Sequence, residues 1–217
     1  MTRAALPRPR LRGVSHQFAF VSASTLAPLM IVAAPGGVPR IVTGVYVVAI
    51  VGLFGISALY HRLTWGARGR TIMRRLDHSM IFVTIAATYT PIAVFTLDQD
   101  TARWILPTVW IGAVVGIVTR LVWAAAPAPL VAAPYLALGW VAVAALPALL
   151  DGLGTAGFVL IVSGGCLYSS GAVFYALRRP NPWPHWFGYH EIFHLFVIGG
   201  VALHYAAIAF YAVPRAA

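Results

Sequence analysis

The sequence predicts an all-α membrane protein built as a bundle of seven transmembrane helices. Of its 217 residues, 60% are hydrophobic and only 9% are charged, whereas soluble domains carry about 25% charged residues. The chain contains seven mainly apolar runs, and the length of each is close to the roughly 20 residues that a helix needs to cross a bilayer. The 15 basic residues are all arginines and lie between these runs or near their ends. That distribution is typical of membrane orientation signals and argues against nucleic-acid binding.

Segments rich in proline, glycine or charge separate the runs and predict turns between helices. They lie at residues 35–39, 66–75, 98–100, 127–129, 151–152 and 178–180. Three internal prolines, Pro91, Pro107 and Pro147, are expected to kink or start helices, which a membrane bundle tolerates. The predicted spans are residues 17–35, 41–61, 76–97, 104–123, 129–150, 156–177 and 188–212.

The chain is expected to divide into a short basic cytoplasmic segment, residues 1–16, and one transmembrane domain, residues 17–217. The first segment lacks the apolar stretch and cleavage site of a secretory signal peptide. Seven spans put twelve arginines on the side of the N-terminus and only three, Arg40, Arg103 and Arg215, on the other side. The positive-inside rule therefore predicts a cytoplasmic N-terminus and an external C-terminus in the cell's inner (plasma) membrane.

This orientation brings five polar residues to the cytoplasmic ends of three spans: Ser57, His61, Asp77, His190 and His194. An ionisable side chain inside a membrane span is energetically costly and indicates a functional site by default. Residues four positions apart share one face of a helix. His190 and His194 can therefore bind one ion together, and Ser57 and His61 have the same spacing.

Three histidines with an open fourth position are typical of catalytic zinc, which lowers the pKa of a bound water to about 7. The sequence predicts Zn²⁺ at His61, His190 and His194, although iron, cobalt or nickel would also suit imidazole ligands. Asp77 is the candidate general base, and Ser57 could hold the water or polarise a carbonyl. The simpler interpretation is that these polar residues only join neighbouring helices by hydrogen bonds.

The remaining histidines are not expected to bind this ion. His16 precedes the first predicted span, and His185 lies in a tryptophan-rich loop. His78 is about 100° around the helix from Asp77, which predicts an interfacial position. His204 is about 15 Å along the helix from His194, so we expect it to be packed within the bundle.

The same residues resemble the motifs of the haemolysin III family of bacterial membrane proteins, which belongs with the progestin and adipoQ receptors and more distantly with alkaline ceramidases. The resemblance spans the second to the seventh helix, essentially the whole chain. Its motifs are Ser57-Ala58-Leu59-Tyr60-His61, Arg74-Arg75-Leu76-Asp77-His78 running to Thr88-Tyr89-Thr90-Pro91, and His190-Glu191-Ile192-Phe193-His194 with His204.

The resemblance implies a seven-helix bundle with zinc near the cytoplasmic side, held by His61, His190 and His194, with Asp77 and Ser57 positioning its water. The implied function is zinc-dependent hydrolysis of an amide in a membrane lipid. The long N-terminal region of the animal receptors is absent, so hormone reception is not expected. The sequence names neither the lipid nor the oligomeric state.

Three alternatives remain open at this point. One is a non-enzymatic, receptor-like regulator of membrane homeostasis with structural zinc. Another is a cytolysin, which the missing export signal disfavours. The third is an intramembrane metalloprotease, because His190-Glu191-x-x-His194 matches H-E-x-x-H with Glu191 as the general base. The protease interpretation leaves Ser57, His61 and Asp77 unexplained, and the family does not fix the residue after the first histidine.

Overall fold

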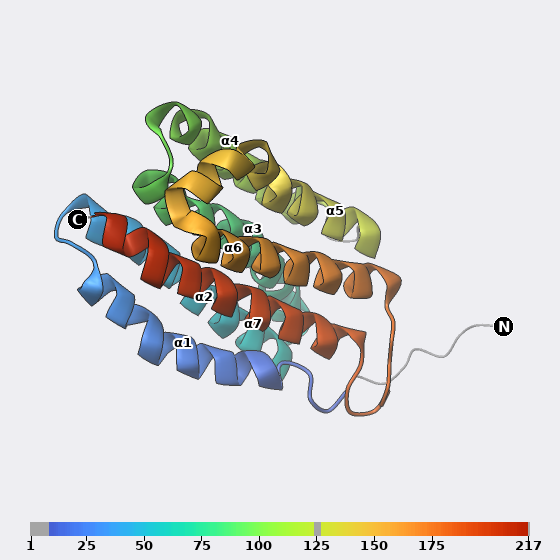
Figure 1. Cartoon of the computed structure of the whole chain (residues 1–217). Coiled ribbons are helices and arrows are strands. Elements are labelled where there is room, and N and C mark those ends of the chain that lie inside the picture. Colours follow the sequence, from blue (N-terminus) through green and yellow to red (C-terminus); the bar gives the residue numbers. More distant parts are fainter. Residues whose placement is uncertain (1–8, 124–126, 217) are drawn as a thin grey trace.

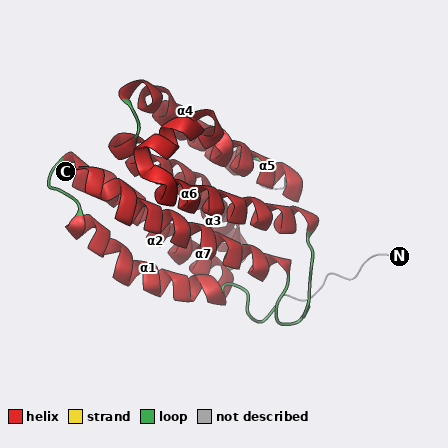
Figure 2. Ribbon diagram, in the orientation of Figure 1, coloured by secondary structure: helices red, strands yellow, loops and turns green. Residues whose placement is uncertain are grey.

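The computed structural model describes residues 9–123 and 127–216, and this part of the chain confirms the predicted all-α class. Figure 2 shows helices joined by short loops, and the described residues contain no strand beyond a single bridge between Trp183 and Phe187. The helices are α1 (Val14–Ala33), α2 (Val38–Arg62), α3 (Ala67–Thr96), α4 (Gln99–Val122), α5 (Ala128–Gly139), α6 (Leu146–Leu177) and α7 (Tyr189–Ala207). A 3-10 helix, η1 (Trp140–Ala145), joins α5 to α6, and η2 (Ile208–Ala212) and η3 (Val213–Ala216) follow α7.

The long helices run side by side, so the bundle has two ends (Figure 1). We call one the histidine end: α1, α3, α5 and α7 begin there, and α2, α4 and α6 end there. The other is the far end. In the packed bundle α2 lies against α1 and α3, α4 against α3, and α7 against α6. Sequentially adjacent helices are thus neighbours in space, as short connections require.

Two groups of buried side chains form the core. The larger joins α1, α2, α6 and α7 and includes Tyr46, Ile50 and Leu153. The smaller fills the space between α3, α4 and α5 around Phe82 and Val109. α3 contributes to both groups, so it connects the two halves of the bundle.

Six helical segments of the described residues are long and apolar enough to cross a membrane. Five of them correspond to predicted spans, and their ends fall at the predicted breaks. Pro39 lies in the first turn of α2, where its missing N–H costs nothing. Pro91 and Pro107 lie inside α3 and α4, as predicted.

The sixth segment, Leu130–Leu177, is 48 residues long and contains both of the predicted spans 129–150 and 156–177. A straight helix of that length would extend about 72 Å, more than twice the hydrocarbon thickness. Figure 1 shows instead that the chain runs out along α5 and back along α6. The predicted break at Asp151-Gly152 lies within α6, and the backbone departs from helical geometry at Gly154, with φ 69° and ψ 170°. Glycine adopts this positive φ without the steric cost that a side chain would add.

The third predicted span starts well after the helix that contains it. We predicted residue 76, but α3 begins at Ala67. The additional turns carry Arg68, Arg70, Arg74 and Arg75. The helix therefore continues beyond its apolar part, which hydrophobicity alone could not show.

Candidate metal centre

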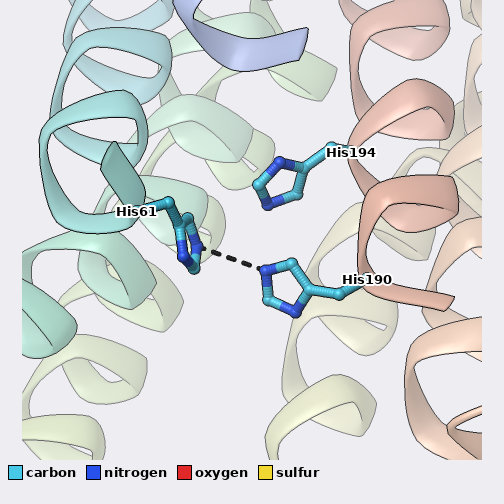
Figure 3. Close-up of side chains that lie close together, drawn as sticks. All are labelled: His61, His190 and His194. Carbon is cyan, nitrogen blue, oxygen red and sulfur yellow. Dashed lines mark hydrogen bonds between the residues drawn. The ribbon is translucent and has the colours of Figure 1, made fainter. Parts of the chain in front are cut away.

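Three histidines from two helices face one another at the histidine end (Figure 3). His61 lies in the last turn of α2, while His190 and His194 lie in the first two turns of α7. One ring nitrogen from each residue lies within 4.8 Å of the others. The Nε2 atoms of His61 and His190 are 3.2 Å apart. The four-residue spacing in α7 directs both of its rings toward His61, as the sequence predicts.

The three donors fit a divalent metal ion. Zinc–nitrogen distances of about 2.0–2.1 Å in a tetrahedral site put neighbouring nitrogens about 3.3 Å apart. The 3.2 Å separation between His61 and His190 is already close to that value. His61 and His194 are only 7% and 2% exposed, and Nδ1 of His194 is buried without a hydrogen-bond partner. Buried polar atoms normally have a partner, so a nearby ligand would explain this one.

Asp77 and Ser57 lie beside the histidines. Asp77, near the start of the apolar part of α3, places Oδ2 3.8 Å from Nε2 of His61. The Ser57 hydroxyl, one turn before His61 in α2, donates a hydrogen bond to the Asp77 carboxylate. Both side chains are buried. The structure thus brings all five predicted site residues together, with a carboxylate and a hydroxyl next to three imidazoles.

A cavity of about 40 Å³ adjoins this group. Its polar lining includes Ser57, Asp77, His190 and His194, and its apolar lining comes from residues of α2, α3, α5, α6 and α7. A single water needs roughly 10–15 Å³ of such space, so the cavity has room for a few waters. It is too small for a whole lipid.

His16 is a site residue that our sequence interpretation missed. We placed it ahead of the first span, but α1 begins at Val14 and buries His16, which is 3% exposed. Its ring stacks on that of His194, with centroids 3.7 Å apart and planes 7° from parallel. Both of its ring nitrogens are buried without a hydrogen-bond partner. The sequence could have indicated this role, because His16 adjoins the predicted cytoplasmic end of the first span, the same end at which His61, His190 and His194 were placed.

Gly13 allows the start of α1 to approach this site. Its φ is 80°, and a Cβ at this position would lie 2.5 Å from Cβ of His61. No side chain fits there without moving His61 or the backbone. Because α1 comes so close to His61 at Gly13, His16 can reach the candidate metal ligands.

Glu191 has a structural partner. Its Oε1 forms an ion pair with Nε of Arg12, and its Oε2 accepts the N–H of Gly188 at 2.8 Å. The carboxylate therefore caps the first turn of α7 and holds the N-terminal segment against it. Since both oxygens are engaged, the structure gives no support to Glu191 as the base of a protease.

The other histidines lie outside the cluster. Nε2 of His204 donates to the carbonyl of Ile161 at 3.0 Å, which confirms its predicted packing role. His185 is exposed in the loop between α6 and α7. The interfacial position of His78 stays a prediction. Its half-buried side chain lines the cavity, and its Nδ1 lies 3.1 Å from Nη2 of the buried Arg120 in α4.

Comparison with known proteins gives one consistent result. A family model described as haemolysin-III related matches residues 4–205. The chain is 32% identical over 200 residues to a protein of Bacillus cereus named Hemolysin-3, covering 91% of this chain and 88% of that protein. It is 34% identical over 169 residues to a Hemolysin-3 homolog of Bacillus subtilis strain 168, covering 78% of this chain and 76% of that protein.

Proposed function

Because the chain belongs to the haemolysin III-related family of membrane proteins, we propose that it is a zinc-dependent hydrolase that cleaves an amide bond of a membrane lipid. The observation that carries this proposal is the convergence of His61, His190 and His194 beside Asp77 and a small cavity. His61, His194 and Asp77 are buried and His190 is partly buried, in a bundle of membrane-spanning length where polar side chains are costly and indicate a function.

In this proposal the three histidines hold zinc, with His61 from one helix and two ligands from another. When bound, zinc supplies Lewis acidity toward a water and a substrate carbonyl. Asp77 takes the proton of the attacking water and returns it to the departing amine nitrogen. The new C–O bond replaces the C–N bond, so the products are a carboxylic acid and an amine.

Ser57 and the cavity walls have supporting roles. Because the Ser57 hydroxyl donates to Asp77, we assign it to positioning that carboxylate. The apolar lining limits the number of waters near the scissile bond. His16 stacks on the ring of His194 and so helps to fix its orientation.

The proposal includes seven crossings, with the N-terminus and the histidine end on the cytoplasmic side. Its support is the 48-residue segment Leu130–Leu177, which turns back on itself and is long enough to cross twice. The distribution of arginines gives the orientation. Alkaline phosphatase fused after the C-terminus should be active in bacterial cells, and a green fluorescent protein fusion there should be dark. The reverse pattern would contradict this topology.

The function is tested by hydrolysis of N-acylated membrane lipids by purified protein in mixed micelles, with release of fatty acid as the readout. We expect Asp77→Asn to lower the rate by about 100-fold or more, because proton transfer contributes about 10²–10⁴-fold. Glu191→Gln should retain most of the activity of the folded protein. The protease alternative predicts instead cleavage of a protein substrate that is lost in Glu191→Gln and kept in Asp77→Asn. Bound zinc without turnover of any lipid amide would favour the non-enzymatic regulator.

A further inference from the structure

A buried arginine lies next to the cavity without a carboxylate partner. Arg120, in the last turn of α4, is only 5% exposed. Its Nη1 donates to the carbonyl of Trp123 at 3.2 Å, and its Nη2 donates to Nδ1 of His78 at 3.1 Å. Its Nε is buried without a partner. A guanidinium has five N–H groups, so donors remain for a further ligand.

No acidic side chain of this protein neutralises Arg120. The chain has five carboxylates, and its ion pairs in the described residues are Arg12–Glu191, His61–Asp77 and Arg103–Asp100. Asp98 is on the same helix as Arg120 but about 33 Å away along it. A buried charge is costly unless it is paired, so an anion from outside the chain is the missing partner.

The location suits an anionic group at the edge of the membrane. An arginine near a helix end can extend to the headgroup region, but Arg120 turns inward to His78, whose side chain lines the cavity. Arginine donates only, so Nδ1 of His78 must accept and Nε2 carries the hydrogen in the neutral ring. Cavity-lining Tyr175 lies within electrostatic range of Arg74 and Arg120 as well as of Asp77, so two guanidinium groups and one carboxylate act on this side of the cavity.

We propose that Arg120 and His78 form a subsite for a phosphate group, beside the cavity of the histidine cluster. Phosphate oxygens accept paired hydrogen bonds from guanidinium groups, and basic pockets between transmembrane helices are suited to lipid headgroups. The phosphate comes from a membrane lipid or from the aqueous phase. The subsite requires no metal, so it can be tested independently of the hydrolase proposal.

The test measures binding to the detergent-purified full chain by titration calorimetry. The probes are dioctanoyl phosphatidate, dioctanoylglycerol as the neutral control, and inorganic phosphate. We expect phosphatidate to bind, and Arg120→Gln to raise its Kd about 10- to 100-fold, as expected for loss of charge-assisted hydrogen bonds. Arg103→Gln, which removes an exposed arginine at the far end, should leave the Kd unchanged. The affinity should persist after treatment with EDTA.

Inorganic phosphate that binds as tightly, with the same loss in Arg120→Gln, would support the subsite and assign it to a soluble ligand. Equal binding of phosphatidate by wild type and Arg120→Gln would overturn the proposal, as would equally tight binding of dioctanoylglycerol. If Arg120→Gln does not fold, Arg120→Lys serves instead. It keeps the charge but loses the planar fork of donors, so the Kd should still rise several-fold.

Discussion

The histidine end and the far end of the bundle differ in whether their ionisable side chains are buried. At the histidine end, six ionisable side chains are buried: His16, His61, Asp77, Arg120, Glu191 and His194. At the far end, the charged side chains are all exposed: Arg40, Asp98, Asp100, Arg103, Asp151 and Arg215. Exposed charges cost little, whereas buried ones must be compensated by partners or ligands. Within the described residues, the difference favours the histidine end as the place where a ligand binds.

The ion pairs at the two ends give the largest contrast. The side chains of Arg12 and Glu191 are 18% and 3% exposed, whereas those of Arg103 and Asp100 are 66% and 94% exposed. Arg12→Ala leaves a buried carboxylate unpaired and should lower the free energy of unfolding by about 3 kcal/mol. Arg103→Ala should change it little, because exposed ion pairs contribute little. Denaturation in sodium dodecyl sulfate followed by circular dichroism would measure both.

The double variant Arg12→Ala/Glu191→Gln provides the control. Removing the second charge should recover a large part of the lost stability, since the cost lies in the unpaired carboxylate. If Arg12→Ala and Arg103→Ala lower the free energy of unfolding equally, the ion pairs at the two ends do not differ in their contribution to stability.

A pair of glycines separates backbone strain from contact with the site. Gly13 and Gly37 both have φ of 80°, but only Gly13 faces a neighbour, the Cβ of His61 at 2.5 Å. With ψ of −137°, Gly37 has a backbone conformation that side chains rarely adopt, so Gly37→Ala should cost about 1–3 kcal/mol from strain alone. Gly13→Ala should cost about 1–3 kcal/mol more through overpacking, and should also weaken metal binding because His61 must move. Thermal midpoints and metal titrations of the two variants make the comparison. Weaker metal binding in Gly37→Ala alone would contradict it.

His16 should affect the metal through its stacking on His194. His16→Ala should weaken metal binding by about 2- to 10-fold, since an aromatic contact contributes about 0.5–1.5 kcal/mol. His16→Phe, which keeps a flat ring, should retain most of the affinity. His204→Ala, on the same helix as His194 but far from the cluster, is the matched control and should leave it unchanged. If His16→Phe binds metal as weakly as His16→Ala, the nitrogen atoms of His16 are what supports metal binding, and stacking is not its role.

The smallest effect is expected at the far end, where Asp98 caps α4. Hydrogen bonds from the side chain and the backbone N–H of Thr101 lower the pKa of the exposed Asp98 carboxyl below its usual value of 3.8. Its contribution is therefore present above pH 3.8 and is lost as the pH falls through the lower folded value. Asp98→Asn keeps an acceptor at the cap and should remove this pH dependence. Amide exchange in the first turn of α4 would show whether it does.

The sequence predicted the helices and the main cluster because both depend on local patterns. Long apolar runs predict spans whatever their partners, and the spacing of His190 and His194 fixes their common face. The charge of the loops then placed Ser57, His61 and Asp77 at the same level. The structure brings these five together.

The features that the sequence did not predict depend on distant contacts. Arg12 and Glu191 are 179 positions apart, and no periodicity relates them. The contact between His78 and Arg120 was not predicted because the two residues lie on different helices. His16 was missed because the start of α1 was predicted three residues late. Gly154 lies in the predicted gap between residues 150 and 156, but the turn signal was assigned to Asp151-Gly152, since local composition does not reveal which glycine adopts a positive φ.

Elemental analysis is the direct test of whether the histidine end binds zinc. Detergent-purified wild-type protein would be compared with the His190→Ala/His194→Ala variant, with circular dichroism to verify that both are folded. We expect about one zinc per wild-type chain and close to none in the variant. Absence of metal from the wild type, or equal zinc in both proteins, would contradict it.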